Sequence, residues 1–255
     1  MASTNAGIDM SAVLAPIFVG LAVSLVLGGI TVVQGYLYFP SKDKMWIQSV
    51  AISMLVMDFI STILVLAAIY NYLIPAFGSL VPFNTFATEL SADCLLSTII
   101  TFISQLYFVY QLFTVTSGKR VEWRVLIWVI LLCAIAALGG GLGCTGIMFI
   151  QRSEILAKKT LTFSMLFGIA KGFGAITDVL ATIAMCSLLA SSKTGITQTN
   201  NLVSSLMVFI VERGALVTLI QVLLVVMFYA LPDRTIWLCL HMLVTKLYVN
   251  TFFGM

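Results

Sequence analysis

The chain has 255 residues, of which 61% are hydrophobic and only 9% charged, and its formal net charge is +3. A soluble domain carries about 25% charged residues, so this composition excludes a water-soluble globule, and the abundance of apolar residues excludes a disordered chain. The small positive charge is typical of basic loops in a membrane protein and gives no reason to expect a nucleic-acid partner. We therefore expect a multi-pass membrane protein whose main partner is the lipid bilayer.

Seven apolar segments are each long enough to cross a bilayer, which takes about 20 residues in a helix. In chain order they cover about 13–39, 46–73, 89–113, 123–150, 161–190, 204–229 and 235–253. The apolar runs are continuous rather than alternating, which favours helices over the strands of a barrel. The sequence therefore predicts an all-α fold, a single domain (1–255) that is an integral membrane bundle of seven transmembrane helices.

Basic residues in the predicted connections indicate the orientation of the bundle. One side carries Lys42, Lys44, Lys119, Arg120, Arg124 and Lys193, whereas the other carries Arg152, Lys158, Lys159 and Arg234. The positive-inside rule then predicts an outside N-terminus and a cytoplasmic C-terminus, and we expect the plasma membrane as the location. The first residues contain no basic side chain and the first apolar run is too long for a signal peptide, so no cleaved signal is expected.

Two kinds of glycine pattern lie inside the apolar segments. Residues 141–146 match the dinucleotide-binding fingerprint by letter, but no strand precedes them, so we do not expect a nucleotide there. The spacings Gly139-x-x-x-Gly143 and Gly168-x-x-x-Gly172 instead favour close packing between helices.

Metal and catalytic chemistry have little support in the sequence. His241 is the only histidine and cannot supply a zinc site by itself, so we expect it to hydrogen-bond inside the bundle or to lie near the outer interface. The five cysteines lie in apolar runs and are expected to be free thiols, although Cys94 and Cys144 could face one side of the membrane and pair. We predict no catalytic residue, no cofactor and no metal, and we do not expect an enzyme.

Ionisable side chains inside the predicted spans are the most informative residues. A charge at the bilayer centre costs at least about 2.5–3.5 kcal/mol, so each one needs a reason. Asp58, Asp178 and Lys246 lie at similar depths, roughly 16–18 Å from a helix end at 1.5 Å per residue. Opposite charges at a common depth can compensate one another. We take Asp58, Lys171, Asp178, Lys246 and Asn250 as a candidate intramembrane polar site.

Polar and small residues around these charges follow helical spacing, which predicts inward-facing stripes. One stripe in the fifth segment consists of Ser164, Gly168, Lys171, Ala175, Asp178 and Thr182, and the third segment offers Ser97, Thr98, Thr101, Ser104 and Gln105. Glu89, Asp93, Glu212 and Arg213 lie near segment ends, where we expect them at the interface. The buried set could be a ligand, ion or proton site, or a satisfied polar core that fixes helix register.

Several motifs occur in an order that is similar to that of a known family. They are Val33-Gln34-Gly35-Tyr36-Leu37-Tyr38-Phe39 with Lys42-Asp43, Met57-Asp58, Tyr70-Asn71-Tyr72, Phe77-Gly78, Asp178, Ser191-Ser192-Lys193-Thr194-Gly195, Thr199-Asn200, Glu212-Arg213-Gly214, Thr218 and Lys246-Leu247-Tyr248-Val249-Asn250-Thr251. Together they resemble a large family of seven-helix membrane proteins, abundant in basidiomycete fungi and described only as a domain of unknown function. The resemblance extends over nearly the whole chain.

The resemblance implies a membrane protein with its N-terminus outside, and it implies no substrate, cofactor or catalytic residue. It places Asp58, Asp178, Lys246 and Asn250 within family motifs. Two departures are visible: Gln111 stands where the family pattern has arginine, and the Leu-Asn-x-Arg segment and polar tail that follow the asparagine in the family are not found after Asn250.

Four classes of function remain to be weighed. A receptor-like sensor of a small-molecule ligand fits seven helices with a polar midplane and comes first. A transporter or proton-coupled channel that uses the midplane charges is the alternative. A retinal photoreceptor is suggested only by Lys246 halfway along the last segment, and an intramembrane enzyme has the least support. The oligomeric state stays open.

Overall fold

The computed structural model describes residues 10–39, 44–74, 87–116, 121–151, 160–191, 197–231 and 234–254. These residues form seven helices and no strand, which confirms the predicted all-α fold. The helices are α1 (Met10–Tyr38), α2 (Met45–Leu73), α3 (Thr88–Thr116), α4 (Val121–Gln151), α5 (Leu161–Ser191), α6 (Thr197–Ala230) and α7 (Ile236–Phe253). All seven are long and apolar enough to cross a membrane.

Most helix ends lie within three residues of the ends expected from hydropathy, and the exception is α6. It begins at Thr197, whereas its apolar run was expected from residue 204. Hydropathy locates the part of a helix that lipid can surround, but a polar first turn can continue the helix into water. Several residues used to orient the bundle, namely Lys42, Lys119, Arg120, Arg152, Lys158, Lys159 and Lys193, lie outside the described residues.

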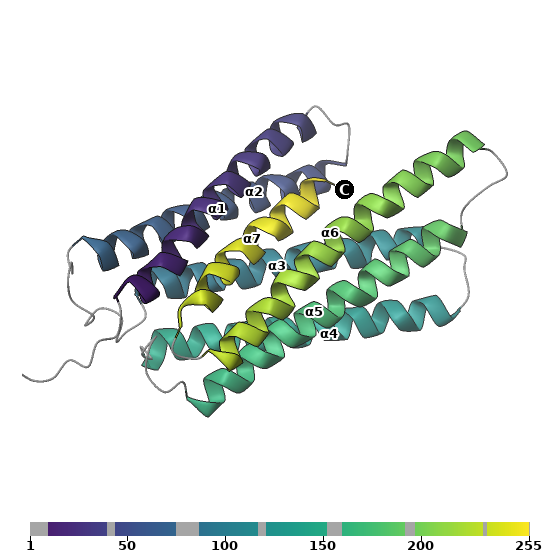
Figure 1. The fold of residues 1–255 in the computed structure, drawn as a ribbon. Coiled ribbons are helices and arrows are strands. Elements are labelled where there is room, and N and C mark those ends of the chain that lie inside the picture. Colours follow the sequence, from purple (N-terminus) through teal and green to yellow (C-terminus); the bar gives the residue numbers. More distant parts are fainter. Residues whose placement is uncertain are drawn as a thin grey trace, which may run out of the picture.

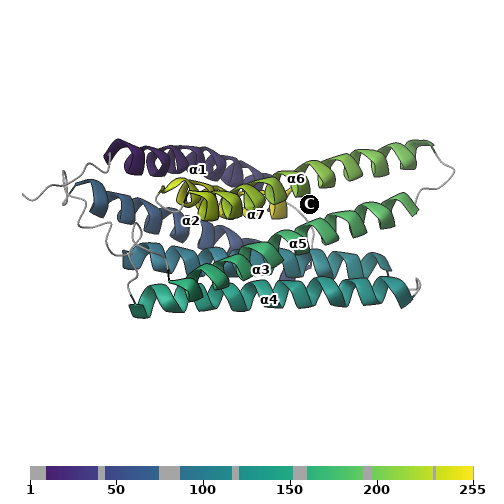
Figure 2. The same cartoon turned by 60° about the horizontal axis from the view of Figure 1, so that its bottom comes forward.

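The helices pack in chain order into a closed bundle. Each helix contacts the next, α7 also contacts α1, and α3 reaches inward to contact both α5 and α7. Figure 1 shows α7 between α1 and α6 and over α3, and Figure 2 shows its short length beside the much longer α6. In the spanning window of α7, 78% of residues are buried, against 28–39% in the other helices. The last helix is therefore the central one.

The outward faces of the other helices are apolar, as a lipid environment requires. Large side chains that are more than half exposed include Phe18, Val26, Ile63, Trp128, Leu132 and Leu219. In water such a surface would be strongly unfavourable. The structure thus agrees with the composition in indicating a multi-pass protein surrounded by lipid.

Close approach between α4 and α5 depends on Gly140. A Cβ atom at this position would lie 2.8 Å from the backbone nitrogen of Ala170 and 2.9 Å from the carbonyl oxygen of Leu166. Gly143 also packs on the Leu166 side chain, but Gly139 is exposed with no atom within 4 Å of a Cβ. The packing role expected for Gly139 was wrong, because the contacting face of α4 is rotated by one residue.

The two glycines of the second pair, in α5, also differ in whether they contact a neighbouring helix. A Cβ atom on Gly168 would meet the hydroxyl of Tyr229 from α6, whereas Gly172 has no atom within 4 Å of this position. The predicted packing therefore applies to Gly168 and not to Gly172. Another close approach joins α1 to α7, where a Cβ atom on Gly20 would lie 2.8 Å from the Cα atom of Cys239.

Candidate functional site

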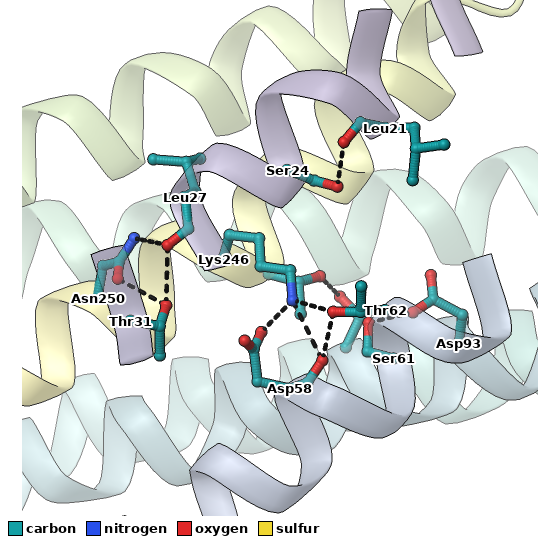
Figure 3. Close-up of polar contacts among 12 residues, drawn as sticks. Leu21, Ser24, Leu27, Thr31, Asp58, Ser61, Thr62, Asp93, Lys246 and Asn250 are labelled. Carbon is teal, nitrogen blue, oxygen red and sulfur yellow. Dashed lines mark hydrogen bonds and ion pairs between the residues drawn. The ribbon is translucent and has the colours of Figure 1, made fainter. Parts of the chain in front are cut away.

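The charges of α2 and α7 meet in a direct ion pair. Lys246 Nζ lies 2.7 Å from Asp58 Oδ1, and the two side chains are 3% and 5% exposed. The same ammonium donates to Thr62 Oγ1 at 2.6 Å and to the Asp58 carbonyl oxygen at 3.1 Å (Figure 3). A lysine ammonium has three N–H donors, so Lys246 is fully satisfied by α2.

Asp178 lies in a separate network and contacts neither Lys171 nor Lys246. Tyr248 Oη donates to its Oδ2 atom at 2.5 Å, and Gln105 Nε2 donates to its Oδ1 atom at 3.3 Å. Gln221 Nε2 in turn donates to Tyr248 Oη. The structure thus pairs only one of these two carboxylates, Asp58, with a lysine and stabilises the other through hydrogen-bond donors from two helices, α3 and α7.

Asn250 joins α7 to α1 and α6. Its Oδ1 atom accepts from Thr31 Oγ1 at 2.7 Å, and its Nδ2 atom donates to the Leu27 carbonyl at 3.3 Å (Figure 3). Arg213 Nη1 donates to the Asn250 carbonyl oxygen. Arg213 was expected at the interface, and its half-buried guanidinium reaches inward to the end of α7.

Asp93 is a buried acid that the sequence analysis placed wrongly at the interface. Its side chain is 1% exposed and accepts a hydrogen bond from Ser61 Oγ at 2.5 Å (Figure 3). Asp93 lies four residues before Ser97 and eleven before Ser104, both fully buried on α3. That spacing puts all three on one helix face. The sequence pattern could therefore have identified Asp93 as a buried residue.

Polar contacts tie α7 to all of its neighbours. Thr245 Oγ1 donates to Ser97 Oγ of α3 at 2.7 Å, and Thr235 Oγ1 donates to the Val13 carbonyl of α1 at 2.6 Å. With the contacts of Lys246, Tyr248 and Asn250, α7 is bonded to α1, α2, α3, α5 and α6. Much of the predicted polar site therefore consists of satisfied groups that hold the central helix in register.

A cavity of about 40 Å³ lies between α3, α4, α5, α6 and α7. It extends from the ends of these helices on the N-terminal side, at Leu90, Met148 and Phe163, to Gln105 and Gln221 nearer the middle. Apolar and aromatic side chains form most of its wall. A space of this size is enough for a few water molecules or a small ligand group.

Polar atoms without partners are concentrated in the walls of this cavity. Both ring nitrogens of His241 and the Oε1 atoms of Gln105 and Gln221 are buried and have no hydrogen-bond partner among the residues that the structure describes, and the same holds for Thr101 Oγ1. Of the two expectations for His241, a hydrogen bond of its ring within the bundle is not seen among the described residues, and a position near the outer interface stays a prediction. A buried polar group without a partner costs free energy, so a water or ligand in the cavity would stabilise these atoms.

Lys171 is the one residue of the predicted site that lines this cavity. It forms no ion pair or hydrogen bond with another residue that the structure describes. Asp58, Lys246 and Asn250 are not among the lining residues, and Asp178 lies beyond the two glutamines. The cavity is therefore a different place from the ion pair, and the retinal interpretation loses support because Lys246 is bonded to Asp58 and does not line this cavity.

Thiols also line the cavity. Cys94 from α3 and Cys144 from α4 face it, and all five cysteines are free. Cys144 Sγ donates to the Phe163 carbonyl at 3.8 Å. Within the described ranges no group of three or more histidine, cysteine or acidic side chains is arranged to hold a metal ion.

Comparison with known proteins relates the last part of the chain to a protein family. The model of a family described as a family of unknown function (DUF6534) matches residues 174–255, the last third of the chain. No curated protein and no solved structure matches. The matched part contains Asp178, Lys246 and Asn250, so the polar contacts of α7 lie in the region that is similar to this family. The wider resemblance, over nearly the whole chain and to fungal proteins, stays a prediction.

Proposed function

We propose that this seven-helix membrane protein is a receptor-like sensor of a small ligand that enters the cavity from the N-terminal side. One observation carries the proposal: buried polar atoms of His241, Gln105 and Gln221 lack partners and line a mainly apolar cavity. Ligand sites typically combine an apolar wall with a few polar groups that orient the ligand. The proposal includes no catalytic step.

The two glutamines provide a physical route from the cavity to the packing of α7. Each amide oxygen is free in the cavity wall, while each amide nitrogen donates into the network of Tyr248 and Asp178. A ligand, or a water molecule bound beside it, that donates to these oxygens would favour one orientation of the amides. Because the amide groups are rigid and planar, the hydrogen bonds that α3 and α6 make with α5 and α7 would change with them.

A transporter or proton-coupled channel is the alternative that the same residues suggest. It needs a water-accessible path past the midplane charges. Asp58 and Lys246 are nearly fully buried and bonded to each other, and neither lines the cavity. These contacts support the sensor over the transporter.

The test measures whether small molecules occupy the cavity. A variant that keeps only Cys144 is reconstituted in nanodiscs, and its reaction with methyl methanethiosulfonate is followed by mass spectrometry in the presence of hexanol, hexylamine, hexanamide or hexanoate. A variant that keeps only Cys133, which is on α4 but outside the cavity lining, is the control. We expect at least one probe to slow the reaction of Cys144 and to leave that of Cys133 unchanged.

The same probe should alter amide hydrogen exchange in α7, and its flux into proteoliposomes should not exceed its flux into protein-free liposomes. Flux above that of the protein-free liposomes would favour the transporter. If Cys144 does not react, or no probe protects it, the cavity is not a ligand site and the sensor proposal fails.

A further inference from the structure

We infer that the ligand of this cavity is a small monocarboxylate with an apolar body, and that Lys171 is its counter-ion. This inference rests on the proposed function, because it assumes that the cavity binds a ligand. It gives a role to Lys171, which forms no ion pair or hydrogen bond with another residue that the structure describes.

Lys171 has no direct counter-ion among the residues that the structure describes. The titratable groups that interact with it electrostatically are Asp93 and Cys94 of α3, Cys144 of α4 and His241 of α7. Asp93 is the only acid among them. Its carboxylate already accepts from Ser61 and does not line the cavity. A positively charged Lys171 would therefore have no neighbouring negative charge to compensate it directly, and a bound anion would stabilise it.

The charge of the lining favours a single negative charge on the ligand. Among the described residues that line the cavity, Lys171 is the only lysine or arginine. One ammonium balances one carboxylate, whereas a phosphate dianion would leave a buried charge uncompensated. A carboxylate also has a second oxygen that can accept from Thr101 Oγ1 or from a ring nitrogen of His241, two groups that lack partners.

The rest of the wall requires an apolar body. Phe102, Leu138, Met148, Phe163 and Phe167 line the cavity together with small residues. Burial of a hydrocarbon chain against them is favourable by the hydrophobic effect. The volume of about 40 Å³ limits the enclosed part to the headgroup and its first carbons. Short-chain fatty acids and compact aromatic acids meet these conditions.

The experiment compares hexanoate with its neutral analogues hexanol and hexanamide in the Cys144 protection assay. We expect hexanoate to protect Cys144 at a concentration at least about tenfold lower than either neutral probe, as a charge-assisted hydrogen bond predicts. Lys171→Met should remove this preference, whereas Lys171→Arg should keep most of it. Lys44→Met removes an exposed cation ahead of α2 and is the matched control that should leave the preference unchanged.

Failure of the inference is separable from failure of the proposed function. If hexanol or hexanamide protects as well as hexanoate, the cavity binds a ligand but the carboxylate inference is overturned. Retention of the preference in Lys171→Met overturns it as well. Lys171→Gln, with a neutral side chain of similar polarity, replaces Lys171→Met if that variant does not fold by circular dichroism, and it should lose the preference in the same way.

Discussion

Some hydroxyls in this bundle are satisfied within their own helix, whereas the charges of Asp58 and Lys246 are not. The hydroxyls of Thr62, Thr145 and Thr177 donate to the carbonyl four residues earlier in their own helix, at 2.8–2.9 Å. Such groups need no other helix. Asp58 and Lys246 have no local partner of this kind, so each depends on another helix. This difference makes single charged residues the sensitive positions of the fold.

The ion pair between Asp58 and Lys246 should show strong coupling. Asp58→Asn or Lys246→Met alone leaves a buried charge without its partner and should cost about 3–5 kcal/mol, whereas the double variant removes both charges and should cost less than the sum. Reversible unfolding in mixed micelles with increasing dodecyl sulfate would measure the three free energies. If the double variant lost as much stability as the two single variants added together, the pair would not be a coupled unit.

Tyr248 should be important through its hydroxyl. Tyr248→Phe keeps the ring but removes the donor to Asp178 and the acceptor for Gln221, so we expect a loss of about 1–3 kcal/mol in the same assay. Tyr36→Phe is the control, because that side chain is 80% exposed on α1. Equal stability of the two variants would contradict the assigned network.

At the level of helices, α4 and α5 provide a matched pair of positions. Gly140→Ala places a methyl group against the backbone of α5 and should cost about 1–3 kcal/mol through overpacking. Gly139→Ala adds the same group where no atom lies within 4 Å, so its stability should stay within about 1 kcal/mol of the wild type. Thermal unfolding of both variants in nanodiscs tests this, and a larger loss for Gly139→Ala would reverse the assigned contact face.

Apolar segments of sufficient length could be predicted from the sequence, but the contact faces between them could not. The helices can be predicted from hydropathy because lipid offers no hydrogen-bond partners, so the backbone N–H and C=O groups must bond to one another within each segment. Gly139 and Gly140 look equivalent in the sequence, and only the rotation of α4 against α5 distinguishes them. Asp93 was misplaced for a related reason: its distance from the helix end suggested the interface, although its spacing to Ser97 and Ser104 placed it inside.

The position of the cavity depends on the whole molecule. Its walls come from α3, α4, α5, α6 and α7, and no segment alone carries a motif for it. Lys171 could be selected from the sequence as a charge inside a span. That it lacks a counter-ion, while Lys246 has one, follows only from how α2 and α7 meet. His241 is a candidate ligand contact for the same reason, because only the assembled bundle shows that its ring nitrogens are buried without partners.

The orientation of the entire bundle determines which solution reaches the cavity. The cavity lies toward the N-terminal side of the bundle, so an outside N-terminus would make the proposed ligand an external one. The distribution of lysine and arginine predicts this orientation.

Glycosylation can test the predicted orientation. The 255-residue sequence contains no Asn-x-Ser/Thr acceptor, so any glycosylation comes from an engineered Asn-Gly-Thr tag and shows on which side of the membrane the tag lies. We expect an N-terminal tag to be glycosylated in a eukaryotic cell and a C-terminal tag to stay unmodified, as judged by a gel shift that glycosidase reverses. Glycosylation of the C-terminal tag alone would invert the bundle and direct the cavity toward a cytoplasmic ligand.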